Sequence, residues 1–247
     1  MRLGLGLGFS GKKVSTFSDP NLAYAKLLMG FDSGVNTSQL FVDESPVART
    51  GFSIGAAANI STDQAKFGPS SLELDGTSDF IRWPDSDDWY FGTGEFTIET
   101  WVRSASNSSV KVLINQANDL NVGATDSSWC LWTFNGTPYF SFYDPAASGW
   151  RDIAGTGVTT LSTWVHIAVD RGADNKIRLY RNGVMVGSYT YAGEMRQITQ
   201  LLGIGTYGGT IGNEFNGYMD EIRILKGKAA WASDSGFTVP TAAYARS

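Results

Sequence analysis

Residues 91–103 read FGTGEFTIETWVR, and from Phe96 onward two sets of side chains alternate along the chain. The apolar set is Phe96, Ile98 and Val102 with Thr100 among them, and the other set is Thr97, Glu99, Trp101 and Arg103. Successive side chains of an extended strand point to opposite sides, so an alternation of period two is typical of a β-strand with one buried face. This stretch therefore predicts a strand at the centre of a β-sheet.

Further strands are predicted on the C-terminal side of this stretch. The chain reads WVHIAVDR at residues 164–171, IRLYRNGVMVGS at 177–188 and FNGYMDEIRILKGKAAW at 215–231. In the second of these, Asn182-Gly183 separates two alternating runs, and this dipeptide readily adopts the positive φ angles of a two-residue hairpin turn. Turn-forming residues recur at short intervals elsewhere, which favours an all-β fold of two packed antiparallel sheets.

Composition limits the classes of protein that the chain can belong to. Its 247 residues are 42% hydrophobic and carry a net charge of −5, with one cysteine, Cys130. Sandwiches of about 200–250 residues often form one domain, so we expect a single sandwich over residues 19–247. The charge argues against a nucleic-acid partner, no apolar run approaches the length of a membrane-spanning helix, and a single thiol excludes an intrachain disulfide. We therefore expect neither nucleic-acid binding nor membrane insertion.

Residues 1–18 form a separate N-terminal segment, which we call the arm. Leu3, Leu5, Leu7 and Phe9 alternate with glycines, so an extended arm places its apolar groups on one side. Either the arm is a frayed tail or edge strand of its own sandwich, or it adds as a strand to another subunit. The second alternative predicts an assembly device and a homo-oligomer.

The four quoted stretches, with LLMGFDSG, AKFGPSSLELDGTSDFIRWP and the closing FTVPTAAY, resemble laminin G-like domains of the concanavalin superfamily. The resemblance covers about residues 19–244 and implies a two-sheet antiparallel jelly-roll sandwich. The variant with DGTSDF early and NGYMDEIRILKGKAAW late is most similar to domains of tailed-phage virion proteins and of some bacterial surface proteins. The resemblance thus implies a non-enzymatic structural subunit, a phage decoration or tail-fibre-associated protein at the particle surface, bound through the arm to other virion or surface proteins. An extracellular or bacterial cell-surface location is the alternative.

One segment has the composition of a sugar-binding site. Sugars offer apolar C–H faces ringed by hydroxyls, so their sites combine a flat aromatic ring with a few polar groups. Trp150 lies in an expected loop, residues 143–152, which also carries the polar or aromatic residues Tyr143, Asp144, Arg151 and Asp152, and Tyr207 in a glycine-rich loop is expected to join them. This predicts adhesion to host glycans. The alternative is that Trp150 folds back onto the sheet edge.

Three aspartates are candidates for a calcium site at the rim of the sandwich. Ca²⁺ takes six to eight oxygen ligands in flexible geometry. Asp75 and Asp79 flank a turn and Asp220 opens a late strand. Aspartates at such positions also bond to the local backbone, which is the alternative. A free calcium-dependent lectin is accordingly a second functional hypothesis.

A glycan hydrolase is a remote third hypothesis. Hydrolases with this sandwich carry two glutamates around an aspartate on one strand, and retaining cleavage needs carboxyl groups about 5–5.5 Å apart. The nearest match is Glu95 and Glu99, with Thr97 where the aspartate belongs. His166, the sole histidine, is flanked by Val165 and Ile167 and is expected to be structural. We therefore expect no catalytic residues.

Overall fold

The computed structural model describes residues 19–55, 57–120 and 126–246, so the arm and its residues Leu3, Leu5, Leu7 and Phe9 lie outside it. The regular elements of the described chain are almost all strands. They are η1 (Leu22–Tyr24), β1 (Ala25–Met29), β2 (Ser53–Ile54), β3 (Asn59–Ser61), β4 (Ser71–Asp75), β5 (Ile81–Trp83), η2 (Asp87–Trp89), β6 (Phe96–Ser104), β7 (Val110–Ala117), β8 (Ser127–Phe134), β9 (Thr137–Asp144), β10 (Gly149–Ala154), β11 (Val165–Arg171), β12 (Lys176–Arg181), β13 (Val184–Thr190), β14 (Leu202–Ile204) and β15 (Asn216–Lys226).

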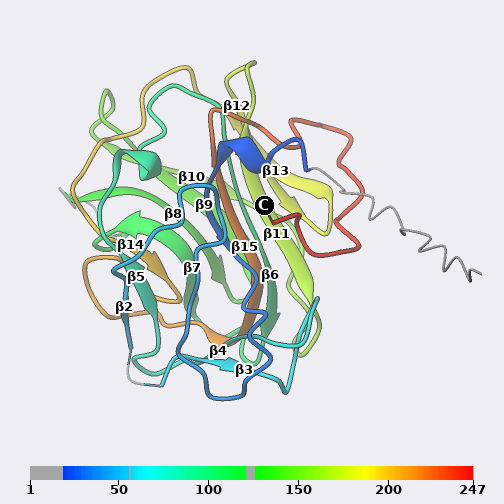
Figure 1. Ribbon diagram of the computed structural model, residues 1–247. Helices are drawn as coiled ribbons and strands as arrows, with labels where there is room; N and C mark the ends of the chain where they lie inside the picture. Colours follow the sequence, from blue (N-terminus) through cyan, green and yellow to red (C-terminus); the bar gives the residue numbers. More distant parts are fainter. Residues whose placement is uncertain (1–18, 56, 121–125, 247) are drawn as a thin grey trace, which may run out of the picture.

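The strands form two antiparallel sheets that pack face to face (Figure 1). The eight-stranded sheet has the order β13-β12-β11-β6-β15-β4-β3, with β1 also paired to β15. The seven-stranded sheet has the order β10-β9-β8-β7-β14-β5-β2. The prediction of an all-β jelly-roll sandwich is confirmed.

The core lies between the two sheets and follows from the alternation in their strands. Phe96, Ile98 and Val102 of β6 are buried there, and Phe140 and Phe142 of β9 meet them from the opposite sheet. Burial of such side chains contributes roughly 1.5–3 kcal/mol each. The same alternation sends the intervening residues of each strand to the outer faces of the sandwich.

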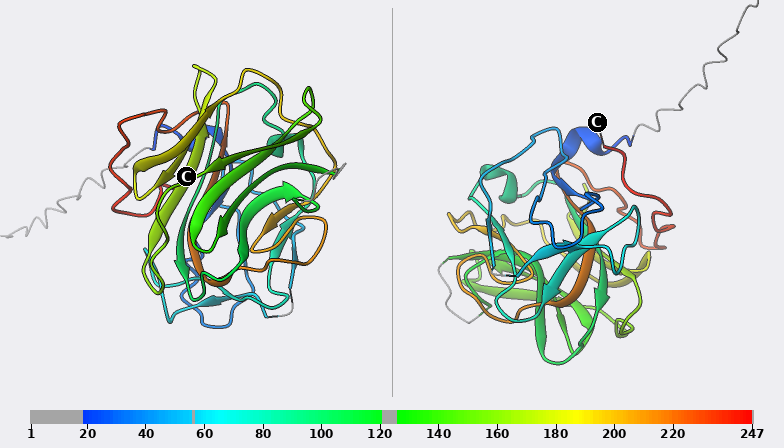
Figure 2. Two further views of the ribbon diagram at one scale, coloured as in Figure 1. Left: turned by 180° about the vertical axis from the view of Figure 1, so that it is seen from behind. Right: turned by 60° about the horizontal axis from the view of Figure 1, so that its bottom comes forward.

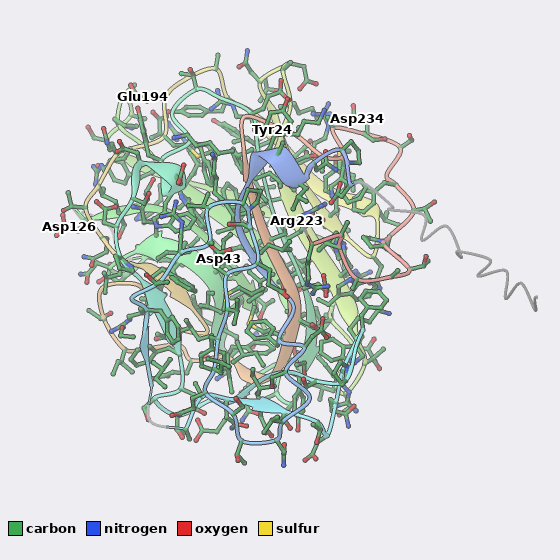
Figure 3. The ribbon with its side chains drawn as sticks, viewed as in Figure 1. Tyr24, Asp43, Asp126, Glu194, Arg223 and Asp234 are labelled. Atoms are coloured by element: carbon green, nitrogen blue, oxygen red, sulfur yellow. The ribbon has the colours of Figure 1, made fainter. Side chains whose placement is uncertain are left out.

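The outer face of the eight-stranded sheet is covered by the chain itself. The C-terminal segment, residues 227–246, crosses it and meets the beginning of the described chain near η1 (Figures 1 and 2). Within the segment Trp231 stacks on Phe237, with ring centroids 3.9 Å apart, and Tyr244 packs over the guanidinium of Arg223 at 3.7 Å. Figure 3 shows Arg223 in the interior, whereas Asp126, Glu194 and Asp234 lie at the periphery.

The seven-stranded sheet keeps part of its outer face open, and β8, β9 and β10 lie in front in the left view of Figure 2. No helix within the described ranges is long and apolar enough to cross a membrane.

Candidate functional site

A groove with a cavity volume of about 380 Å³ opens on the outer face of the seven-stranded sheet. Its walls come from β7 to β10 and from the loops that flank them. The lining residues are Val110, Asp119, Leu120, Trp132, Ser141, Trp150, Asp152, Tyr207 and Asn213.

Strand register explains why these side chains share one face. Phe140 and Phe142 of β9 point into the core, so Ser141 between them points outward. Directly paired residues of antiparallel strands project to the same side. Asp152 of β10 pairs with Ser141, and Trp150 pairs with Tyr143, so both β10 side chains also lie on the outer face.

A chain of hydrogen bonds fixes the polar floor of the groove. The indole N–H of Trp132 donates to the Ser141 hydroxyl oxygen at 2.8 Å, and the Ser141 hydroxyl donates to Oδ1 of Asp152 at 2.6 Å. At the other wall, Nδ2 of Asn213 donates to the Tyr207 hydroxyl oxygen at 3.0 Å. Burial raises the pKa of Tyr207, so its hydroxyl keeps its proton and can donate. These groups are ordered before a ligand arrives.

Aromatic rings are the other main component of the groove. The ring of Trp150 is half-buried and meets Tyr143 edge to face, with centroids 6.0 Å apart. Trp132 stacks on Tyr139 at 4.5 Å. Rings held in this way present rigid apolar surface beside hydrogen-bonding groups, which is the combination that a sugar requires.

The structure brings some of the predicted sugar-binding residues together and separates others. Trp150 and Tyr207 both line the groove, and Tyr143 is buried behind Trp150. Asp144 and Arg151 lie outside the lining, because Arg151 pairs with core-facing Phe142 and its Nε donates to Asp144 Oδ2 at 3.1 Å. Sugar contact by these residues stays a prediction.

The segment expected to be a projecting loop is instead a hairpin. β9 continues to Asp144 and β10 begins at Gly149, so Trp150 sits within an edge strand. Burial alone would raise the pKa of Asp144, but hydrogen bonds from Tyr191, Ala147 and Arg151 lower it below its usual value. Asp144 is therefore a structural anion that holds the turn and the adjacent chain.

Sequence reasoning missed six groove residues, namely Val110, Asp119, Leu120, Trp132, Ser141 and Asn213. Trp132 was detectable in principle, because it alternates with the core residues Trp129 and Leu131 in SWCLWTF. Nothing in the sequence marks Asp119 or Asn213, since their position depends on loops that only the folded chain brings to the sheet.

The three aspartates proposed for calcium do not form one cluster. Asp75 accepts hydrogen bonds from Thr77, and Asp79 accepts from the backbone N–H of Asp75 and Ala57 at 3.0 and 2.8 Å. Asp220 accepts from the backbone of Lys66, Phe67 and Glu221, and burial raises its pKa to about 8. Within the described part of the chain, no group of three or more carboxylate, histidine or cysteine side chains could hold a metal. Calcium binding stays a prediction without a complete ligand set.

Glu99, which the hydrolase hypothesis requires, lies on the other sheet from the groove. It is fully buried beneath the C-terminal segment, and Arg223 Nε donates to its Oε1 at 2.7 Å. His166 Nε2 is 3.3 Å from Oε2, and the Trp231 indole donates to the same oxygen at 3.0 Å. Burial alone would raise the pKa of Glu99, but the charge of Arg223 and the hydrogen bonds from His166 and Arg223 lower it to about 2. This carboxylate is enclosed and fully occupied.

The fold of the chain is similar to those of several solved binding domains. The binding domain of Paraclostridial mosquitocidal protein 1 has a TM-score of 0.64 at 14% identity, with 84% of this chain and 50% of that chain covered. The binding domain of botulinum neurotoxin serotype G has a TM-score of 0.62 at 14% identity, with 83% and 49% covered. The chain thus spans about half the length of these toxin domains.

A third similar structure has nearly the same extent as this chain. It is domain 4 of AbnA, an extracellular arabinanase from Geobacillus stearothermophilus, determined in complex with arabinotriose. Its TM-score is 0.60 at 18% identity, with 83% of this chain and 93% of that domain covered. At such identities the likeness concerns the fold. A search of curated proteins by sequence finds no match.

Residues 75–232, more than half of the chain, match the sequence profile of a laminin G-like family described as "Concanavalin A-like lectin/glucanases superfamily". The matched range runs from the end of β4 through β15 and contains every residue that lines the groove. Sequence profile, sandwich topology and solved relatives therefore agree, and the chain belongs to the concanavalin A-like lectin/glucanase superfamily.

Proposed function

We propose that the protein is a non-catalytic glycan-binding domain and that the groove on its seven-stranded sheet holds the sugar. The observation that carries this proposal is the arrangement of Trp132 and Trp150 around the hydrogen-bonded pair Ser141 and Asp152 in one cavity of about 380 Å³. The volume falls within the range of small-molecule sites, about 300–1,000 Å³. Similar solved structures include binding domains and a domain in complex with arabinotriose, which supports the same class of function.

A glycan array tests this proposal. We expect the full chain to bind a subset of the glycans, and we expect Trp150→Ala to weaken that binding by about tenfold or more, because the ring supplies the stacking surface. Phe134→Ala is a matched control, since Phe134 is an exposed ring of the same sheet that lies outside the groove lining. A blank array with folded protein, or equal binding by Trp150→Ala, would defeat the proposal.

We also propose that this glycan-binding domain is displayed on a phage particle or on a bacterial surface. Its support is the sequence resemblance to tailed-phage virion proteins, together with the Leu/Gly pattern of residues 1–18. In this function the arm joins the domain to a partner structural protein or to further copies of the chain, and the sandwich meets host glycans.

Deletion of residues 1–18 tests the role of the arm. We expect the truncated protein to keep its unfolding transition and its glycan binding but to lose assembly, measured by co-purification with particles and by the oligomeric state in solution. Assembly that survives the deletion would remove the arm from the proposal and leave the groove untouched.

A further inference from the structure

The groove is acidic as well as aromatic. Two of its lining residues, Asp119 and Asp152, are acidic, and none of the lining residues in the described chain is a lysine, arginine or histidine. Among the lining residues that the structure describes, a ligand in this cavity therefore meets negative charge and no positive side chain.

Three arginines that contact Tyr143, Asp144 or Tyr207 are engaged outside the groove lining. The guanidinium of Arg196 lies over the Tyr143 ring at 3.2 Å, and Arg151 is paired with Asp144 at 3.1 Å. Arg82 donates from Nε to the main-chain carbonyl of Tyr207 at 3.0 Å. Each of these three arginines lies outside the lining and already contacts another group of the protein.

The charge of Asp152 is held in place. Its Oδ1 accepts the Ser141 hydroxyl, so the carboxylate cannot turn away from a ligand without losing this hydrogen bond, and the Ser141 oxygen is itself held by the Trp132 indole N–H. Trp132, Trp150, Val110 and Leu120 supply apolar walls around it. Asp152 itself is exposed, so a like charge on a ligand is repelled across solvent, and the repulsion weakens as salt is added.

We infer that the groove selects its glycans by charge, accepting uncharged and amino sugars and rejecting sugars that carry a carboxylate or sulfate, with Asp152 as the specificity-determining residue. This inference rests on the proposed glycan-binding function of the groove. A site that places an unfavourable charge against the wrong ligand gains specificity without any new attractive contact. An amino sugar gains instead, because its ammonium group meets Asp152 as an opposite charge.

The test uses oligosaccharides that share one backbone and differ only in charge. Each set contains an uncharged member, a 2-amino member and a member with a carboxylate at C6. One such set is cellohexaose, chitosan hexaose and the corresponding glucuronate hexamer. Sets built on several different backbones are placed on the same array. For any backbone that binds, we expect the full chain to prefer the uncharged or amino member over the carboxylated one by about tenfold or more. Raising the salt from about 0.1 M to about 1 M shortens the Debye length from about 10 Å to about 3 Å and should narrow the difference.

The variant Asp152→Asn isolates the proposed residue. It keeps a side-chain oxygen to accept from Ser141, so the hydrogen-bond chain survives while the charge is removed. We expect the preference to fall below about threefold. Asp63→Asn is the matched control, because Asp63 is exposed and lies outside the groove. This substitution removes the same unit of charge, so the preference for uncharged and amino sugars should remain.

The outcomes separate the two proposals. Equal or tighter binding of carboxylated sugars by the unmodified protein would overturn selection by charge while leaving glycan binding intact. An unchanged preference in Asp152→Asn would overturn the role of Asp152. A blank array would overturn the glycan-binding function itself, and the charge inference with it.

Discussion

Glu99 is the residue whose surroundings differ most from what a catalytic carboxylate needs. It is the acceptor for Arg223, Trp231 and His166 in a site without solvent. Arg223 is also buried and has Asp19 as a second partner. Buried charges are tolerated only when they are paired, so the network holds the C-terminal segment and the beginning of the sandwich against β6 and β15.

Glu99→Gln should destabilise the fold by about 3 kcal/mol, because it leaves Arg223 short of one buried partner. The measurement is the free energy of unfolding in urea, with glycan binding as a parallel readout that we expect to be unchanged in the folded fraction. Glu95→Gln is the control, since Glu95 precedes the strand and is partly exposed. An unfolding free energy equal to that of the unmodified protein would contradict the role of the buried pair.

The lowered pKa of Glu99 also predicts how the stability of the fold depends on pH. Its pKa is about 2 in the folded protein, below the reference value of 4.5 for the unfolded chain. The unfolded state therefore binds the proton more tightly, and the contribution of Glu99 is complete above about pH 4.5 and declines as the pH falls toward 2. We expect the Glu99→Gln variant to lose less stability than the unmodified protein between pH 5 and pH 3, as followed by thermal unfolding. Parallel curves would show that Glu99 titrates normally.

Among the elements, the β12–β13 hairpin confirms the sequence prediction most directly. Asn182 and Gly183 have φ angles of 49° and 77°, as the Asn-Gly dipeptide predicts. The turn has a second function that the sequence does not reveal, because the site of a Cβ on Gly183 lies 2.1 Å from the carbonyl oxygen of Phe237. The hairpin is thus a support for the C-terminal segment.

Gly183→Ala should cost about 2 kcal/mol or more, since alanine is strained at positive φ and its methyl group would displace Phe237. Differential scanning calorimetry measures the loss as a lower Tm. Gly149→Ala is the matched control, because the nearest atom to its added Cβ is 3.7 Å away. If the two variants have the same Tm, the turn does not support the segment.

At the scale of the whole molecule, the two outer faces of the sandwich have different roles. One is sealed by the C-terminal segment, where Arg246 contacts Glu221 and donates from Nε to Glu44 at 2.6 Å, and where the backbone N–H of Tyr244 donates to Glu221 at 2.9 Å. The other carries the groove. The sealed face stabilises the fold, and the proposed glycan site lies on the open face.

Removal of residues 240–247 should lower the unfolding free energy by about 4 kcal/mol, because Glu221 loses its buried partners and Arg223 loses the ring above it. A shift of the urea midpoint to lower concentration measures this loss. A truncated chain that unfolds at the original midpoint would show that the segment is a passive cover.

The sequence by itself determined the strands, the hairpin and the sandwich, because alternation of period two and turn-forming dipeptides are local properties of the chain. It also predicted Trp150 and Tyr207 as members of one site, and both line the groove, while sugar contact by them stays a prediction. The sequence did not show that Trp150 lies in a strand or that Asp144 and Arg151 lie outside the groove. It also did not show that Asp220 forms no metal-binding group with Asp75 and Asp79. Those outcomes depend on register and on pairing between distant segments. Only the tertiary structure decided which outer face is closed, because the contacts that close it join residues far apart in the sequence. Trp231 contacts Glu99, more than a hundred residues away along the chain, and Tyr244 contacts Arg223, about twenty residues away.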